Sequence, residues 1–394
     1  PEINVLKLTL QDQLVGYLIG FKNGRNALHF SSEYKNDPLR PTFSLITHPD
    51  FPNAEKLLAK PWPKNQRLHP TLSNLLPEGA LRELIAQRLK THIDNEFQLL
   101  SSLGQDLPGA LIATPLEPEE VPDSILSTYG KVKAVRFNAE TKENKFSLAG
   151  IQMKFSMQEN NGHYHLTKGN DLGDWIIKTP STQHKHVPLN EYTAMTLASL
   201  AGVNIPDILL VDRDQNKRIH TEDFAQVLVK YPHEKYNAAN YEQIAKVLYQ
   251  FSGEGLADVQ QLARRLLVNI LLANGDAHLK NWSLLYKDHY TPTLSPAYDI
   301  VTTHVYIENE TQYALNLGKN KAWFNATTKH FQIWANKSGI PWRTIRPHLD
   351  DTLERARSLW PSALENLPMD ETHKEKLKIH WRNLKEDFRI ESNK

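Results

Sequence analysis

A short segment between two apolar stretches holds the residues best suited to chemistry. It runs from Leu271 to Leu285, and within it Asp276 and Asn281 have a D-x-x-x-x-N spacing. That spacing is typical of loops that catalyse phosphoryl transfer. The reaction needs a carboxylate that orients or deprotonates the attacking hydroxyl, and oxygen ligands that hold Mg²⁺. The pattern therefore predicts Asp276 as the catalytic base and Asn281 as a metal ligand.

A further acidic residue follows a β-hairpin that we predict at 282–286 and 293–296. Asp299 lies in an aromatic-Asp-apolar triplet at 298–300, where kinases place the aspartate that holds Mg²⁺. We therefore predict Asp299 as a second metal ligand. A simpler interpretation stays open, in which Asn-Gly-Asp at 274–276 is only a turn and Asp299 only caps a helix.

Two residues upstream have the types and the order that ATP binding requires. Lys178 ends an apolar strand predicted at 174–178, and Glu191 lies in an amphipathic helix predicted at 189–200. In kinases a lysine and a glutamate in this order form the ion pair that positions the phosphates of ATP. Alone, each is typical of a solvated strand end or helix face. Because both precede the three downstream residues in the required order, the set favours an ATP-dependent kinase.

The segments that would contact the rest of ATP are less regular. Residues 146–154 contain a single glycine instead of G-x-G-x-x-G, although backbone N–H groups there could cradle phosphate. Glu222-Asp223-Phe224 ends a predicted strand and is a possible hinge for adenine. A routine strand end is an equally open interpretation.

The order of predicted elements indicates an α+β protein with a two-lobed, kinase-like fold. A β-rich N-terminal lobe, with an added N-terminal subdomain, precedes a mostly helical C-terminal lobe, and a cleft between such lobes commonly binds ligands. We place the N-terminal subdomain at 1–112, the kinase N-lobe at 140–229 and the helical C-lobe at 230–394. Strands are expected at 3–10, 14–21, 109–114, 145–157, 163–166, 208–211, 219–222 and 226–230; helices at 77–88, 95–103, 241–251, 259–273, 327–337, 344–360 and 373–389; and a loosely structured connection at 117–138.

Composition excludes several other classes of function. The chain has 394 residues with 46 basic and 45 acidic side chains, so its net charge gives no argument for nucleic acid or membrane as partner. It has no cysteine, which excludes disulfides, thiolate metal sites and a cysteine nucleophile. The N-terminal segment has no signal-peptide pattern, and the apolar runs are shorter than the ~20 residues of a membrane span. We therefore expect a cytoplasmic protein.

Taken together, the motifs resemble those of the HipA kinases, which are toxins of type II toxin–antitoxin pairs. The resemblance covers nearly the whole chain. It is carried by segments 74–79, 108–111, 146–154, 177–178, 190–192, 201–206, 276–281 and 296–300.

The resemblance implies ATP and Mg²⁺ as cofactors and assigns several roles by position. Asp276 is expected as the base, with Lys178 and Glu191 beside it in the catalytic set. Ser147 matches the serine that family members autophosphorylate to inactivate themselves. The metal ligands are expected at Asn281 and Asp299, and nucleotide contacts at Ala149, Gly150, Ile151, Gln152, Met153, Lys154, Lys178, Glu222, Phe224, His278, Lys280 and Tyr298.

The resemblance also implies partners. These are a helix-turn-helix antitoxin, operator DNA contacted through that antitoxin, and a protein substrate of the aminoacyl-tRNA synthetase class. The hinge segment 222–226 departs from the Arg-Phe-Asp-Arg type of sequence expected there. Two alternatives stay open. His278, two residues after Asp276, also fits the D-x-H-x-x-N pattern of aminoglycoside kinases, and a non-catalytic corepressor partner of an antitoxin would share the fold.

Overall fold

The computed structural model describes residues 2–135, 154–160, 163–166, 175–178, 184–206 and 218–391. The predicted autophosphorylation site Ser147, the phosphate-loop residues Ala149 to Met153 and the strand predicted at 208–211 lie outside these residues. Lys154 is described for its backbone alone.

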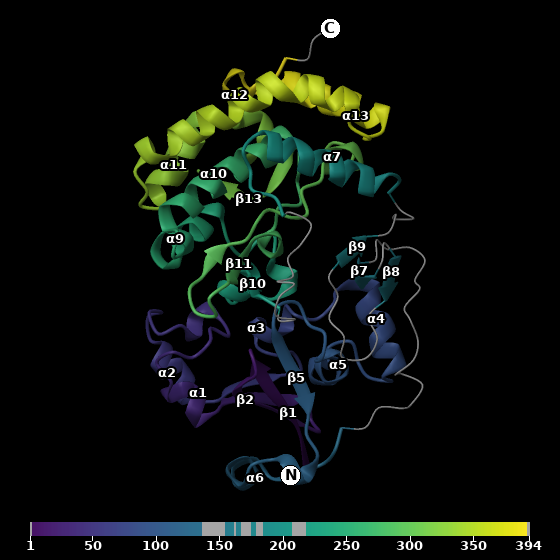
Figure 1. Ribbon diagram of the computed structural model, residues 1–394, viewed down its shortest axis with the longest axis vertical. Coiled ribbons are helices and arrows are strands. Elements are labelled where there is room, and N and C mark those ends of the chain that lie inside the picture. The colour runs from purple at the N-terminus through teal and green to yellow at the C-terminus, as the bar shows by residue number, and fades with distance from the viewer. Residues whose placement is uncertain are drawn as a thin grey trace.

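An antiparallel sheet forms the centre of the N-terminal domain, at the lower end of Figure 1. The predicted hairpin is confirmed, since β1 (Glu2–Leu10) pairs with β2 (Gln13–Phe21) in a register that sets Val5 opposite Ile19. The other strands of this sheet are β3 (Arg25–Phe30), β4 (Trp62–Asn65) and β5 (Leu111–Pro115). The strand order is β4-β3-β2-β1-β5. The alternating apolar side chains of these strands form one core with the helices that cover them, as the period of two requires. Those helices are α1 (Ser32–Asn36), α2 (Ala54–Ala59), α3 (Pro70–Ser73), α4 (Gly79–Arg88) and α5 (Glu96–Leu103).

The connection after β5 is more ordered than its composition indicates. It contains η2 (Pro118–Glu120), helix α6 (Asp123–Tyr129) and strand β6 (Lys131–Val132), which pairs with β1. Ile125 of α6 is 1% exposed and packs into a small apolar cluster with Ile3 and Val5. The prediction of a loosely structured segment at 117–138 is therefore wrong for its described part, because one buried side chain anchors the helix to the sheet.

A second, three-stranded sheet carries Lys178. Its order is β8-β7-β9, from β7 (Lys154–Asn160), β8 (His163–Leu166) and β9 (Trp175–Lys178). Helix α7 (Val187–Leu200) follows and confirms the predicted helix. Gly202 ends it with φ +89°, a left-handed conformation that favours glycine after a helix.

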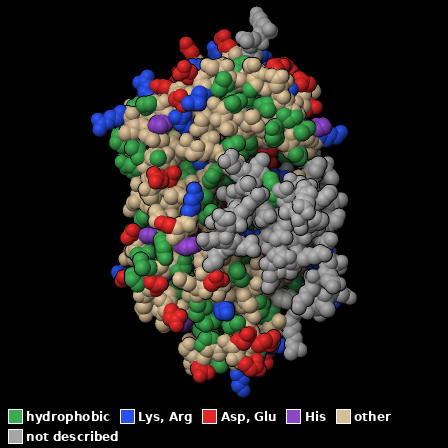
Figure 2. Space-filling model, in the orientation of Figure 1, with side chains coloured by type: hydrophobic (Ala, Val, Ile, Leu, Met, Phe, Trp, Pro, Cys, Tyr) green, Lys and Arg blue, Asp and Glu red, His purple; other side chains and the backbone are tan. Residues whose placement is uncertain are grey.

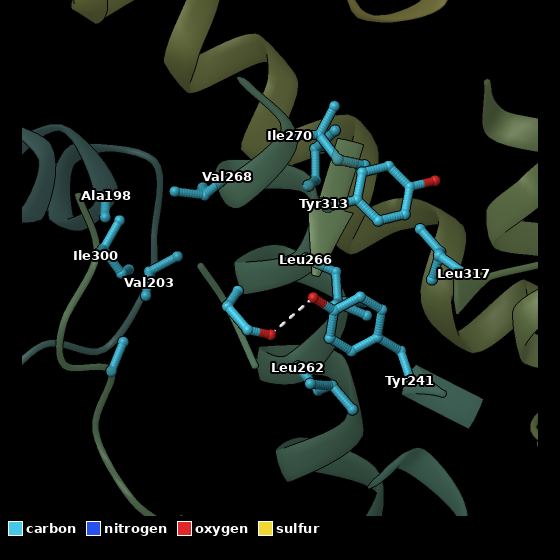
Figure 3. Packing of buried hydrophobic residues seen from close by; sticks show 14 of the residues in the cluster. Ala198, Val203, Tyr241, Leu262, Leu266, Val268, Ile270, Ile300, Tyr313 and Leu317 are labelled. Atoms are coloured by element: carbon cyan, nitrogen blue, oxygen red, sulfur yellow. Dashed lines mark hydrogen bonds between the residues drawn. The ribbon is translucent and has the colours of Figure 1, made fainter. Parts of the chain in front are cut away.

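Helices dominate the C-terminal lobe, as predicted. They are α9 (Tyr241–Phe251), α10 (Gly255–Leu271), α11 (Thr328–Lys337), α12 (Trp342–Asn366) and α13 (Glu371–Asn383), followed by η8 (Glu386–Phe388). Figure 3 shows how Tyr241 of α9 packs beside Leu262 and Leu266 of α10. The Tyr241 hydroxyl donates to the carbonyl oxygen of Ala277 at 2.8 Å. The core thus contacts the segment 274–281, which is the predicted catalytic loop.

Short strands lie between this lobe and the N-terminal domain. β10 (His220–Asp223) pairs with β11 (Ser283–Tyr286), which pairs with β12 (Thr293–Leu294), so the predicted hairpin is confirmed. The prediction that 226–230 extends a sheet is wrong, because helix α8 (Phe224–Val227) begins there. Asp223 and Gln226 form a capping box, which satisfies the first N–H groups of this short helix. A hairpin of β13 (Gln312–Leu317) and β14 (Asn320–Ala322) was not predicted.

A membrane span requires a helix of sufficient length and apolar character. Among the described residues, no helix is long and apolar enough to cross a bilayer. On the face shown in Figure 2, acidic and basic side chains are interspersed over the parts that are coloured.

Candidate active site

Three predicted residues from separate elements meet at one ammonium group. Nζ of Lys178, at the end of β9, contacts the carboxylates of Glu191 in α7 and of Asp299 in the loop after β12. The three side chains are 21%, 15% and 24% exposed. Burial disfavours the charge on Lys178, but attraction by Asp299 and Glu191 outweighs it and raises the pKa of this lysine. Lys178 is therefore held as a cation between two carboxylates.

The catalytic loop is fixed by hydrogen bonds to its own backbone. Nδ2 of Asn274 donates to Oδ1 of Asn269 at 2.7 Å, and Oδ1 of Asn274 accepts from the backbone N–H of Asp276 at 3.0 Å. Nδ2 of Asn281 donates to the carbonyl oxygen of Asp276 at 2.6 Å. These bonds join the two ends of the D-x-x-x-x-N segment, so the side chain of Asn281 lies against the backbone of Asp276.

The side chain of Asp276 is half-exposed, at 51%. Its Oδ1 accepts a hydrogen bond from the hydroxyl of Tyr236 and lies 3.9 Å from Nε2 of His278. Partial burial raises the pKa of Asp276, while the bond from Tyr236 opposes that rise. Burial lowers the pKa of His278 to about 3, with further lowering by nearby lysines, so His278 is neutral. A half-exposed carboxylate with an accepting oxygen has the geometry of a general base.

Gly275 lets the loop pass close to a neighbouring carboxylate. A Cβ at this position would lie 2.1 Å from Oε1 of Glu310 and 3.0 Å from the carbonyl oxygen of Gln312. Glu310 accepts a hydrogen bond from the Thr303 hydroxyl at 2.7 Å, and Thr303 accepts one from the N–H of Gly275 at 2.7 Å. Burial, together with the charge of Asp276, raises the pKa of Glu310 to about 7.

A small cavity joins the two predicted metal ligands. Asn281 and Asp299 line it, together with the buried Arg265 of α10. Asp299 has φ +53°, a left-handed conformation that is uncommon for a residue with a side chain and that clusters at functional sites. Burial lowers the pKa of Arg265 to about 10, and its Nε has no hydrogen-bond partner in the described structure.

The oxygen donors at this cavity suit Mg²⁺. The side-chain nitrogen of Asn281 donates a hydrogen bond to the carbonyl oxygen of Asp276. The side-chain oxygen of Asn281 is therefore the atom that remains for a cation. Among the described residues, no group of three or more histidine and acidic side chains is arranged to hold a metal alone. In kinases Mg²⁺ takes one or two protein ligands and completes its shell with phosphate oxygens and water, and Asn281 and Asp299 would supply ligands of that kind.

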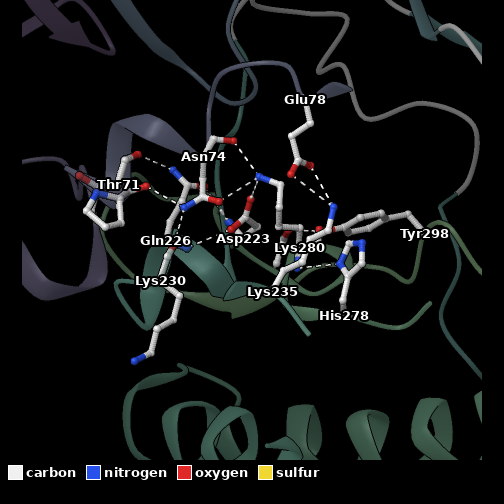
Figure 4. Close-up of polar contacts among 12 residues, drawn as sticks. Thr71, Asn74, Glu78, Asp223, Gln226, Lys230, Lys235, His278, Lys280 and Tyr298 are labelled. Carbon is white, nitrogen blue, oxygen red and sulfur yellow. Dashed lines mark hydrogen bonds and ion pairs between the residues drawn. The ribbon is translucent and has the colours of Figure 1, made fainter. Parts of the chain in front are cut away.

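Two residues expected near the nucleotide are bonded to protein groups instead. Nζ of Lys280 donates to the carbonyl oxygen of Asn74 at 2.8 Å and forms an ion pair with Asp223 at 3.1 Å. The hydroxyl of Tyr298 donates to the carbonyl oxygen of Lys280 at 2.8 Å and lies 2.5 Å from Oγ of Ser283. Figure 4 shows Lys280 between Asn74 of the N-terminal domain and Asp223 at the end of β10. Both residues brace the catalytic loop in this structure, and their contact with nucleotide stays a prediction.

The predicted hinge residues are also turned toward protein. Glu222 is 1% exposed, and its Oε1 accepts from the backbone N–H of Leu45 in the N-terminal domain at 3.2 Å. Burial raises the pKa of Glu222 to about 8. Phe224 is fully buried in the core of the C-terminal lobe, and its N–H donates to the carbonyl oxygen of Trp282. A hinge role for these two residues stays a prediction that their side chains do not support.

Sequence reasoning missed Tyr236, Glu310 and Arg265. Tyr236 follows an irregular Pro-His-Glu-Lys stretch and Glu310 lies in a loop, so neither has a periodic signal. Arg265 stands next to Arg264 in an amphipathic helix and looks like a solvated residue. Arg264 is partly buried and pairs with Asp351, whereas Arg265 is fully buried.

Comparison with known proteins identifies the family. The profile of the HipA-like C-terminal domain matches residues 146–360, and that of the HipA N-terminal domain matches residues 6–114. The chain is 36% identical to the Sinorhizobium fredii protein Y4dM over 399 residues, which cover 94% of each chain. It therefore belongs to the HipA family, as its motifs predicted.

Two further matches, both from Shewanella oneidensis, complete the comparison. The serine/threonine-protein kinase toxin HipA is 24% identical over 286 residues, which cover 62% of this chain and 65% of that one. A solved complex of HipA, HipB and operator DNA has a chain that superposes with a TM-score of 0.72 at 20% identity, covering 96% of this chain and 97% of that chain. The α+β, two-lobed kinase-like fold is thereby confirmed.

Proposed function

We propose that this protein is an ATP-dependent serine/threonine protein kinase of the HipA type. One observation carries the proposal: Lys178, Glu191 and Asp299, from three elements separated by up to 121 positions in the chain, meet at a single ammonium group. The cluster joins the end of strand β9, the helix α7 that follows it and a distant loop. Kinases require that arrangement, because Lys and Glu position the phosphates while an aspartate holds the metal.

In the proposed reaction each residue of the candidate site has a separate role. Lys178 contacts the phosphates of ATP, and Glu191 orients its ammonium group. Asn281 and Asp299 hold Mg²⁺, which when bound supplies neutralisation of the phosphate charge. Asp276 accepts the proton of the attacking hydroxyl and directs that hydroxyl at the γ-phosphorus. Asn274 and Asn281 keep Asp276 in place through the loop bonds already described.

The finer parts of the proposal come from the family. We infer that the acceptor is a serine of a protein, of the aminoacyl-tRNA synthetase class, and that the chain acts as a toxin neutralised by a helix-turn-helix antitoxin bound to operator DNA. Autophosphorylation of Ser147, which lies outside the described residues, would add about −1.5 to −2 charges next to the triphosphate and switch the enzyme off. The solved Shewanella oneidensis complex of HipA with HipB and operator DNA supports the choice of partner.

The test is mass spectrometry after incubation with Mg-ATP, with and without a host-cell lysate. We expect phosphoserine on the chain itself and on one or a few lysate proteins. Phosphate on a small molecule alone would favour the aminoglycoside-kinase alternative that the D-A-H sequence at 276–278 left open. ATP left unconsumed in every mixture would favour a non-catalytic partner of an antitoxin.

A further inference from the structure

In the loop before α9, the side chain of Tyr236 contacts the predicted catalytic base, Asp276. The hydroxyl of Tyr236 donates a hydrogen bond to Oδ1 of Asp276. The Tyr236 ring packs edge-on against His278, with centroids 5.0 Å apart and planes at 89°. Tyr236 is 38% exposed, so the contact is made at the open side of the loop, where an acceptor must arrive.

The hydrogen bond from Tyr236 occupies the carboxylate oxygen to which a substrate hydroxyl would donate. In phosphoryl transfer the attacking hydroxyl donates toward the carboxylate of the base. Burial and the neighbouring Asp276 carboxylate raise the pKa of Tyr236, so its hydroxyl stays protonated and remains a donor. A serine hydroxyl or a water molecule approaching Asp276 Oδ1 therefore competes with a donor that is already bound.

Tyr236 is held in place from the N-terminal domain. Nζ of Lys235 lies 5.7 Å from the centroid of the Tyr236 ring and forms an ion pair with Glu78 at 3.1 Å. Glu78 precedes α4, and its reach to Lys235 is visible in Figure 4. The carbonyl oxygen of Lys235 also accepts from the N–H of Leu279 in the catalytic loop at 3.2 Å. The position of Tyr236 thus depends on both the catalytic loop and a separate domain.

We propose that Tyr236 occupies the acceptor-hydroxyl position on Asp276 and must be displaced before phosphoryl transfer. Tyr236 is then a positioning residue that restricts access to the base, and the Glu78–Lys235 pair holds it closed. The inference rests on the proposed kinase function. It explains how a kinase with a half-exposed base limits wasteful transfer to water: in that reaction an O–P bond forms between water and the γ-phosphorus, the bond to the ADP oxygen breaks, and the water proton passes to Asp276.

The test is the rate of Mg-ATP hydrolysis, with water as acceptor, in wild type and Tyr236→Phe. The variant keeps the ring against His278 and removes only the hydroxyl. We expect the rate of hydrolysis to rise roughly two- to tenfold, because the loss of one ordinary hydrogen bond changes an equilibrium constant by about that factor. Glu78→Gln should give a smaller rise, because it only loosens the ion pair beneath the ring.

Tyr249→Phe is the control for the tyrosine, since Tyr249 is 42% exposed on α9. Asp106→Asn is the control for the ion pair, since it weakens a different ion pair made by the N-terminal domain, with Arg218.

The outcomes separate the two proposals. An active wild type whose rate is unchanged or lowered by Tyr236→Phe overturns the displacement model, and a lowered rate would make Tyr236 a group that orients Asp276. Equal rises in Glu78→Gln and Asp106→Asn would remove the specific role of the Lys235 pair. A wild type that neither hydrolyses ATP nor phosphorylates itself rejects the kinase function and the displacement model together.

Discussion

The two halves of the candidate site are held by different forces. The catalytic loop at 274–281 is bonded to its own backbone and to the buried end of α10, with the hydroxyl of Tyr241 beneath it. In the half that holds Lys178, strand β9 pairs with β7 and Asn190 of α7 exchanges two hydrogen bonds with the backbone of Thr302. The side chains of Lys178, Glu191 and Asp299 themselves meet through charge. Packing and hydrogen bonds fix the predicted base, whereas an ion cluster joins the predicted phosphate-binding residues.

That difference has a functional meaning. Backbone hydrogen bonds in a packed loop change little when a ligand binds, so the predicted base Asp276 is preorganised. In the proposed function the ion cluster would exchange partners when phosphates and Mg²⁺ arrive, because Lys178 would then contact phosphate and Asp299 the metal. Changes in the phosphate half should therefore affect activity far more than stability, and changes beneath the catalytic loop should affect both.

The largest effect is expected from Lys178→Met. The variant leaves Glu191 and Asp299 without their shared cation and removes the predicted phosphate contact. Loss of one preorganised charged contact typically lowers turnover by about 10²–10³, and we expect a loss of that size in autophosphorylation measured with Mg-ATP. Lys378→Met is a matched control, because Lys378 also lies between two carboxylates, Glu365 and Glu375. If both variants lose activity equally, the role of Lys178 is only structural.

A smaller effect is expected from Gly275→Ala, which tests the catalytic half. The added methyl group displaces the Glu310 carboxylate and breaks its bond with Thr303, whose loss should cost about 0.5–1.5 kcal/mol of the free energy of unfolding. Turnover should fall as well, since the base follows Gly275 directly. In the double variant Gly275→Ala, Glu310→Ala the nearer clash is absent. A double variant that recovers no turnover would show that Glu310 is not the obstacle.

The smallest effect concerns stability at the interface between domains. The pKa of Glu222 is raised from 4.5 to about 8, so the protonated form favours the fold. This contribution is complete below about pH 4.5 and is lost as the pH rises through about 8. In Glu222→Gln that loss is absent, and the variant should melt at a higher temperature relative to wild type at about pH 9 than at about pH 5. A difference in melting temperature that is independent of pH would contradict the burial of this carboxyl.

Much of the site was predictable because its residues follow a fixed order. Lys178, Glu191, Asp276, Asn281 and Asp299 were predicted from their spacing and from the elements around them, and the structure brings Lys178, Glu191 and Asp299 together and sets Asp276 beside Asn281. The long helices of the C-terminal lobe were predicted for a similar reason, since their apolar period repeats over several turns.

The rest depends on contacts that leave no periodic signal. α8 is four residues long and is defined by its capping box, and α6 is anchored by one buried isoleucine among acidic residues and prolines. Lys280 and Glu222 look like site residues in the sequence. Their side chains bind the N-terminal domain because that domain docks against β10 and α8. Tertiary docking of a separate domain cannot be deduced from local pattern.

The central claim is that Asp276 is the base of a phosphotransferase, and single-turnover transfer by Asp276→Asn tests it most directly. The variant keeps the size of the side chain and removes its ability to accept the hydroxyl proton. We expect the wild type to consume Mg-ATP and form phosphoserine, and the variant to bind nucleotide and melt normally while transfer falls by about 10²–10⁴. A variant that transfers phosphate within a factor of about two of wild type would contradict the account.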